Sequence, residues 1–100
     1  MSIEYTGKLI PELSDEHVEL LIQKISEIQG LSVLVKTSNE LRTGLVENMN
    51  PEQEAIKFIV KSDQVYVGFH VCNRNQRDRI LELISLMIRD SGSDCEFNEE

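Results

Sequence analysis

The sequence predicts one α+β domain, a ferredoxin-like sandwich in which two helices pack on one face of an antiparallel sheet. Its 100 residues, 40% of them hydrophobic, match a single domain with one core, so we treat residues 1–100 as one unit. In two segments the apolar residues recur at helical spacing, and in the other segments they alternate as in strands. The predicted order of elements is β-α-β-(β)-β-β-α-β. Two helices over one sheet are the simplest packing of that order.

The first strand and the first helix follow from local signals. Residues 3–9 alternate loosely before Pro11, which is typical of a strand that ends at a turn. Ser14 is a suitable N-cap for the following helix, and Gly30 is expected to end it. The apolar residues of this helix recur at helical spacing: Val18, Leu21, Ile22, Ile25 and Ile28.

The next segment is predicted to be a strand over residues 31–37, with Leu31, Val33 and Val35 on one face. After a turn, residues 41–50 carry only a weak alternation, which favours an edge strand. Asn50 followed by Pro51 indicates the start of a helical turn, and the β-forming residues beyond limit it to one turn.

The second half contains the best hairpin, residues 55–61 and 65–72, and then a helix that ends near Gly92. Asn73 or Asn75 caps this helix. Its apolar residues cover more than half of its circumference. The apolar side chains that do not face the sheet must therefore be buried by the first helix, by residues 41–54 or by another chain. Burial by another chain would make the protein a homodimer. Residues 95–97 form a short last strand, and residues 98–100 a frayed tail.

The charge balance separates classes of partner. Eighteen acidic residues against ten basic ones give a formal net charge of -8, which disfavours binding to nucleic acid and to anionic membranes. An acidic surface instead suits a basic protein partner. The N-terminus lacks the basic and apolar regions of a signal peptide, and no apolar run could span a bilayer. We therefore expect a cytoplasmic protein with Cys72 and Cys95 as free thiols.

The candidate chemistry is sparse. His70 and Cys72 project from one face of a predicted strand, and with His17 and Cys95 they would supply four zinc-type ligands. Their spacing matches no zinc finger, and the chain has no Cys-x-x-Cys pair. Neighbours two apart on a strand lie roughly 6–7 Å apart, too far for direct proton transfer from thiol to imidazole. We expect no catalytic site, no metal and no cofactor.

One basic cluster surrounds the start of the second helix: Arg74, Arg77 and Arg79. Together with Tyr66 on an antiparallel sheet it suggests an RNA-binding surface, but the aromatic residues do not match the stacking positions of such sheets. We expect these arginines to pair with Asp78, Glu82 or the acidic tail.

The acidic residues gather in two segments. Residues 89–100 hold five carboxylates against Arg89. The weakly structured segment 40–54 holds four against Arg42, and these four are our predicted partner-binding residues: Glu40, Glu47, Glu52 and Glu54. A purely solubilising loop is the alternative interpretation.

The whole chain resembles the small acidic immunity proteins of bacterial contact-dependent growth inhibition and related polymorphic toxin systems. The resemblance lies in length, acidity, α+β order and the opening Ile3-Glu4-Tyr5-Thr6-Gly7-Lys8-Leu9. It implies a non-enzymatic cytoplasmic antidote that covers the basic active site of one cognate toxin domain, often a nuclease. Two alternatives remain: a small-molecule-binding regulatory domain that acts as a homodimer, and an enzyme that uses Cys72 or His70.

Overall fold

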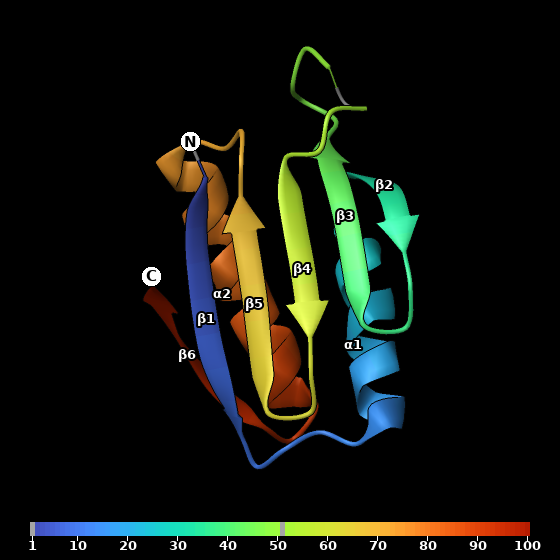
Figure 1. Ribbon diagram of the computed structural model, residues 1–100, viewed down its shortest axis with the longest axis vertical. Coiled ribbons are helices and arrows are strands. Elements are labelled where there is room, and N and C mark those ends of the chain that lie inside the picture. Colours follow the sequence, from blue (N-terminus) through green and yellow to red (C-terminus); the bar gives the residue numbers. More distant parts are fainter. Residues whose placement is uncertain (1, 51) are drawn as a thin grey trace.

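The computed structural model describes residues 2–50 and 52–100, in which two helices pack on one face of a six-stranded antiparallel sheet (Figure 1). Along the chain the elements are β1 (Ile3–Ile10), α1 (Asp15–Ser26), β2 (Leu31–Lys36), β3 (Glu40–Leu45), β4 (Ile56–Val60), β5 (Gln64–Phe69), α2 (Arg74–Asp90) and β6 (Asp94–Glu99). The strands lie in the order β2-β3-β4-β5-β1-β6. The predicted α+β class is confirmed.

The topology is compatible with the predicted ferredoxin-like arrangement. The unit β5–α2–β6 places β5 and β6 on either side of β1, which is the split βαβ connection of that fold. The unit β1–α1–β2 is a wider version, because β5, β4 and β3 all lie between its two strands. The predicted hairpin β4–β5 is present, with Phe58 opposite Val67.

The core lies between the sheet and the two helices. Strand alternation sends every second side chain inward, and Leu41, Phe58 and Val67 stand side by side in one register row. Tyr5 packs edge-to-face on Phe69, with ring centroids 5.8 Å apart. The helices contribute aliphatic side chains that are buried: Val18, Leu21, Ile22 and Ile25 from α1, and Ile80, Ile84 and Ile88 from α2.

The predicted caps hold both helices. The Ser14 side chain accepts a hydrogen bond from the His17 backbone N–H at 3.2 Å. Asn73, not Asn75, caps α2 and forms a reciprocal capping box with Gln76. Helix α1 ends at Ser26 and the chain turns into β2 at Gly30, whose φ of 98° favours glycine.

Two strand predictions need correction. Strand β3 is internal, between β2 and β4, and is not an edge strand. The true edge is β2, where the register shifts so that Val33 opposes Thr43 but Val35 opposes Arg42. This bulge at Leu34 moves Val35 to the face without helices, so the prediction of one shared face is wrong for Val35.

The C-terminus and α2 also differ from expectation. The predicted frayed tail is ordered, because Asn98 and Glu99 belong to β6 and the Glu100 N–H donates to the Glu4 carbonyl at 2.9 Å. The surplus apolar side chains of α2 are partly covered by the contacts of α2 with β6 and α1, while Leu86 stays 47% exposed. The helical turn predicted at Pro51 lies outside the described residues.

Candidate functional site

Two of the four predicted partner-binding carboxylates have basic neighbours on the face of the sheet that lacks helices. Arg42 Nε lies 2.9 Å from Glu40 Oε2, and Arg42 Nη1 lies 3.5 Å from Glu54 Oε1. The second oxygen of Glu54 lies 2.9 Å from His70 Nε2. The charges of Glu40 and Glu54 are therefore partly offset inside the molecule.

The other two predicted carboxylates lie apart from this cluster. Glu47 follows β3 and accepts a hydrogen bond from the Gln76 side chain of α2. Glu52 is exposed in the loop between β3 and β4. The structure thus brings Glu40 and Glu54 together through Arg42, and no ion pair in the described residues includes Glu47 or Glu52. Their role in partner binding stays a prediction.

A larger group of carboxylates lies at the end of the sheet that is opposite the β3–β4 loop, where three connecting segments converge (Figure 1). The Leu9 and Leu13 N–H groups donate to the carbonyls of Asp63 and Ser62, each at 2.8 Å. The Ser93 hydroxyl, which is buried, donates to the Pro11 carbonyl at 2.5 Å. These bonds connect residues 10–16, 61–64 and 89–94 in one surface, which we call the acidic end.

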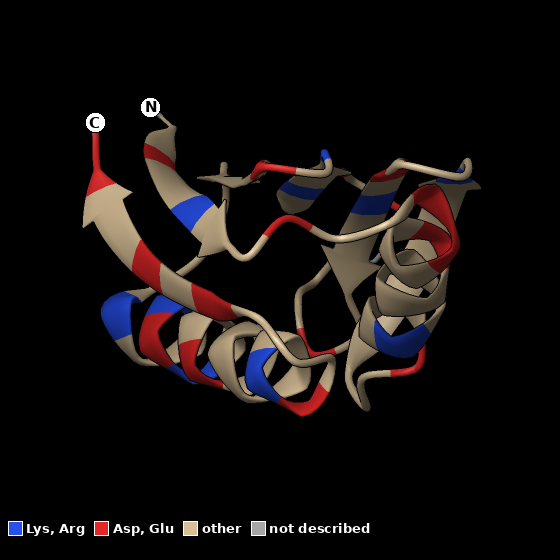
Figure 2. Ribbon diagram, turned by 90° about the horizontal axis from the view of Figure 1, so that it is seen from below, with Lys and Arg blue, Asp and Glu red and all other residues tan. Residues whose placement is uncertain are grey.

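The charge of the acidic end is strongly negative. Six carboxylates against Lys61 and Arg89 leave a net charge of -4, half of the formal -8 of the whole chain. All six are exposed, and Figure 2 views this end from below: Glu12, Asp15, Glu16, Asp63, Asp90 and Asp94. Among the described residues, the one ion pair recorded here joins Arg89 to Asp94 at 3.9 Å between largely exposed side chains, so it offsets little charge.

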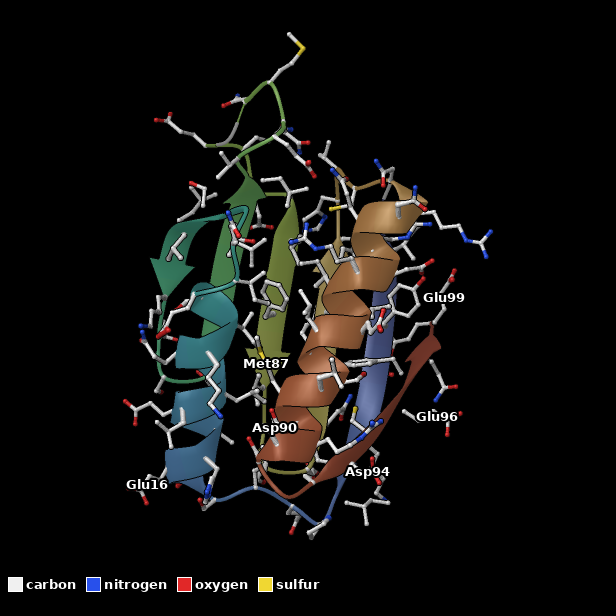
Figure 3. The ribbon with its side chains drawn as sticks, turned by 180° about the vertical axis from the view of Figure 1, so that it is seen from behind. Glu16, Met87, Asp90, Asp94, Glu96 and Glu99 are labelled. Carbon is white, nitrogen blue, oxygen red and sulfur yellow. The ribbon has the colours of Figure 1, made fainter. Side chains whose placement is uncertain are left out.

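The two helix dipoles have opposite effects on the electrostatic potential of the acidic end. The carboxyl end of α2 adds the negative end of its dipole beside Asp90, while the amino end of α1 stabilises Asp15 and Glu16. Figure 3 shows Glu16, Asp90 and Asp94 spread across this end and directed outward. Ile10, which opposes Asp94 in the register and is 63% exposed, supplies an apolar contact among the charges.

Only part of this surface could be predicted from the sequence. The excess of acid in residues 89–100 was visible, but Asp15 and Glu16 also have a local role at the helix start. Asp63 lies in a hairpin turn with no special signal. The fold alone shows that these segments meet, because the convergence depends on hydrogen bonds between residues about 50–80 positions apart, such as Leu9 to Asp63 and Pro11 to Ser93.

The four candidate zinc ligands are not brought together. His70 binds Glu54, and His17 Nδ1 lies 2.7 Å from the Ser14 hydroxyl at the start of α1. In residues 2–50 and 52–100, no three His, Cys, Asp or Glu side chains come close enough to hold a metal ion.

Both thiols are free and are poor nucleophiles. Burial raises the pKa of Cys72 to about 11, against a lowering effect of Arg77. Burial, with the nearby charge of Asp94, raises the pKa of Cys95 to about 11 as well. Because the thiolate is the reactive form, these raised pKa values leave both thiols mostly protonated near neutral pH.

Of the three arginines around the start of α2, one forms a predicted ion pair. Arg74 lies 3.9 Å from Asp78. Arg77 donates to the Cys72 carbonyl at 3.0 Å, and no ion pair in the described residues includes Arg79.

Tyr66 forms a hydrogen bond to a carboxylate on the face of the sheet without helices. Its hydroxyl donates to Glu4 Oε1 at 2.6 Å. Desolvation of the phenol and this bond to a carboxylate together raise the pKa of Tyr66 to about 12 from its ordinary value of 10.0.

This raised pKa predicts a loss of stability in alkali. Between pH 10 and 12 the unfolded state loses the phenol proton while the folded state keeps it, so the free energy of unfolding falls as the pH rises through this window. Urea unfolding at about pH 9 and about pH 12, which are on the order of one unit below this window and at its upper limit, measures the fall. Tyr66→Phe retains both thiols and should show a smaller fall. An equal fall in both proteins would contradict the assignment.

Comparison with known proteins adds no relative. The chain matches no protein-family model, no curated protein and no solved structure. In the described part of the chain, no helix has both the length and the apolar character that crossing a bilayer requires.

Proposed function

We propose that this protein is a non-enzymatic inhibitor that binds a basic protein through its acidic end. The observation that carries the proposal is the convergence of six exposed carboxylates, from segments far apart in the sequence, on one hydrogen-bonded surface. A negative surface attracts a positively charged partner over several ångströms, raises the association rate and rejects other acidic proteins.

The mode of inhibition follows from the chemistry of the surface. Carboxylates held at fixed positions resemble the phosphates of a nucleic acid, so they suit the basic substrate channel of a nuclease domain. The exposed side chain of Ile10, opposite Asp94, adds an apolar contact to the charged surface. We propose that the protein acts in the cytoplasm as the antidote to such a toxin domain, as immunity proteins do.

The proposal predicts that a gene next to that of this protein encodes a toxin domain with a basic substrate channel, and the test uses that domain. The two proteins should form a complex, and their co-expression should restore the growth of cells that the toxin domain alone arrests. Glu12→Lys/Asp63→Lys/Asp90→Lys replaces three carboxylates of the acidic end. Its association rate in stopped flow should fall about tenfold or more at low ionic strength, and the difference should shrink in salt.

A matched variant separates this surface from net charge. Glu52→Lys/Glu82→Lys/Glu99→Lys makes the same change of charge at exposed positions elsewhere, including one predicted contact of the β3–β4 loop. It should retain most of the association rate, and circular dichroism should show both variants folded. Equal losses in the two variants, or a larger loss in the second, would exclude the acidic end as the binding surface.

A further inference from the structure

A hollow of about 480 Å³ lies at the other end of the molecule, where the start of α2 faces the ends of α1 and β3. The two helices lie side by side over the sheet, as Figure 3 shows. The hollow has an apolar floor that includes the buried side chains of Leu45 and Ile80 together with Leu31. Its volume lies within the range of small-molecule sites, about 300–1,000 Å³.

Two side chains of opposite charge line this hollow. Arg79 projects from the second turn of α2, and no ion pair in the described residues includes it. Glu47 stands on the facing wall, at the end of β3. The first turn of α2 holds no acidic residue, so the positive end of the helix dipole adds to the charge of Arg79.

The carboxylate of Glu47 is bonded to the same helix that carries Arg79. Glu47 accepts a hydrogen bond from the side chain of Gln76, which lies three residues before Arg79 on the same helix. Residues three apart on a helix have Cβ atoms about 5–6 Å from each other. A carboxylate and a guanidinium that line the same hollow fit a ligand that carries an ammonium and a carboxylate on one carbon.

We propose that this hollow binds a free α-amino acid with an apolar side chain. The guanidinium of Arg79 pairs with the carboxylate of the ligand, and the carboxylate of Glu47 with its ammonium group. The apolar side chain lies on Leu31, Leu45 and Ile80, which removes it from water. The amides of Asn73 and Asn75 line the rim and offer further hydrogen bonds. This site is independent of the acidic end.

The test is a titration of the full chain with leucine, methionine and phenylalanine, followed by calorimetry and by amide chemical shifts. At least one of them should bind and shift the amide signals of Leu45, Val46 and Ile80. 4-Methylpentanoate lacks the ammonium group of leucine and isopentylamine lacks its carboxylate. Each should bind about tenfold more weakly than leucine, because one charge-assisted contact is lost.

Variants in and beside the hollow complete the experiment. Arg79→Gln and Glu47→Gln should each weaken binding about tenfold, while Arg74→Gln and Glu52→Gln, outside the hollow, should leave it unchanged. The proposal is overturned if none of the three amino acids shifts a signal up to about 10 mM. It is also overturned if 4-methylpentanoate binds as well as leucine, or if Arg79→Gln retains full affinity.

Discussion

Phe58→Ala is expected to lower the free energy of unfolding by about 3–5 kcal/mol. The ring is fully buried in β4, between Leu41 and Val67 in the central register row and beneath the helices. Its removal loses the largest apolar burial in the core and leaves a cavity that the neighbouring strands cannot fill. A domain of this size is stable by only about 5–15 kcal/mol, so the loss is a large fraction of the total.

Urea unfolding followed by circular dichroism measures this change, and the next residue on the same strand provides the control. Ile59 points to the face without helices and is only partly buried. Ile59→Ala should therefore cost about 1 kcal/mol or less. If the two substitutions had equal effects, the assignment of Phe58 to the inner face would be wrong.

Gly7→Ala is expected to destabilise the protein by about 3 kcal/mol, because the position between β5 and β6 has no room for a side chain. A Cβ at Gly7 would overlap with Cys95 Sγ and would lie 3.2 Å from the Phe97 ring and 3.3 Å from the Glu96 carbonyl. Two of these neighbours are a packed ring and a backbone group, so neither yields easily. The same unfolding measurement applies.

Cys95→Ala tests the cause of the strain. In the Gly7→Ala background it removes the sulfur atom that the new methyl group meets first, so the double variant should be more stable than Gly7→Ala alone. Gly68→Ala is the contrasting case, since its Cβ meets the outer end of the Tyr66 side chain at 2.8 Å. Tyr66 can relieve this contact by rotating its side chain, which loses the bond to Glu4 but moves no backbone, so the cost should be smaller. Additive effects of Gly7→Ala and Cys95→Ala would refute the proposed contact.

The elements with a clear local signal were predictable from the sequence. Ser14 and Asn73 cap their helices through their own side chains, and the hairpin β4–β5 alternates without interruption. The elements that were predicted wrongly depend on pairing between strands that are far apart in the sequence. No residue near Leu34 in the sequence predicts the bulge, because the bulge arises from the pairing of β2 with β3. Glu99 belongs to a strand only because β1 lies beside it.

The candidate surfaces were less predictable than the fold. The sequence grouped Glu40, Glu47, Glu52 and Glu54 because they are neighbours along the chain. In the structure Arg42 offsets two of them, and Gln76 holds a third against α2. Segments that meet only after folding, such as those containing Pro11, Asp63 and Ser93, define the acidic end. The sequence shows how many charges each segment carries, but it does not show which segments form one surface after folding.

The two borders of the sheet have a consequence for behaviour at high concentration. An unpaired border strand is a template on which further chains can add and build fibrils. Here one border is interrupted at Leu34, and the other carries the repelling charges of Asp94, Glu96 and Glu99. A second molecule therefore finds no straight, neutral strand to extend, which favours a protein that stays dispersed in a crowded cell.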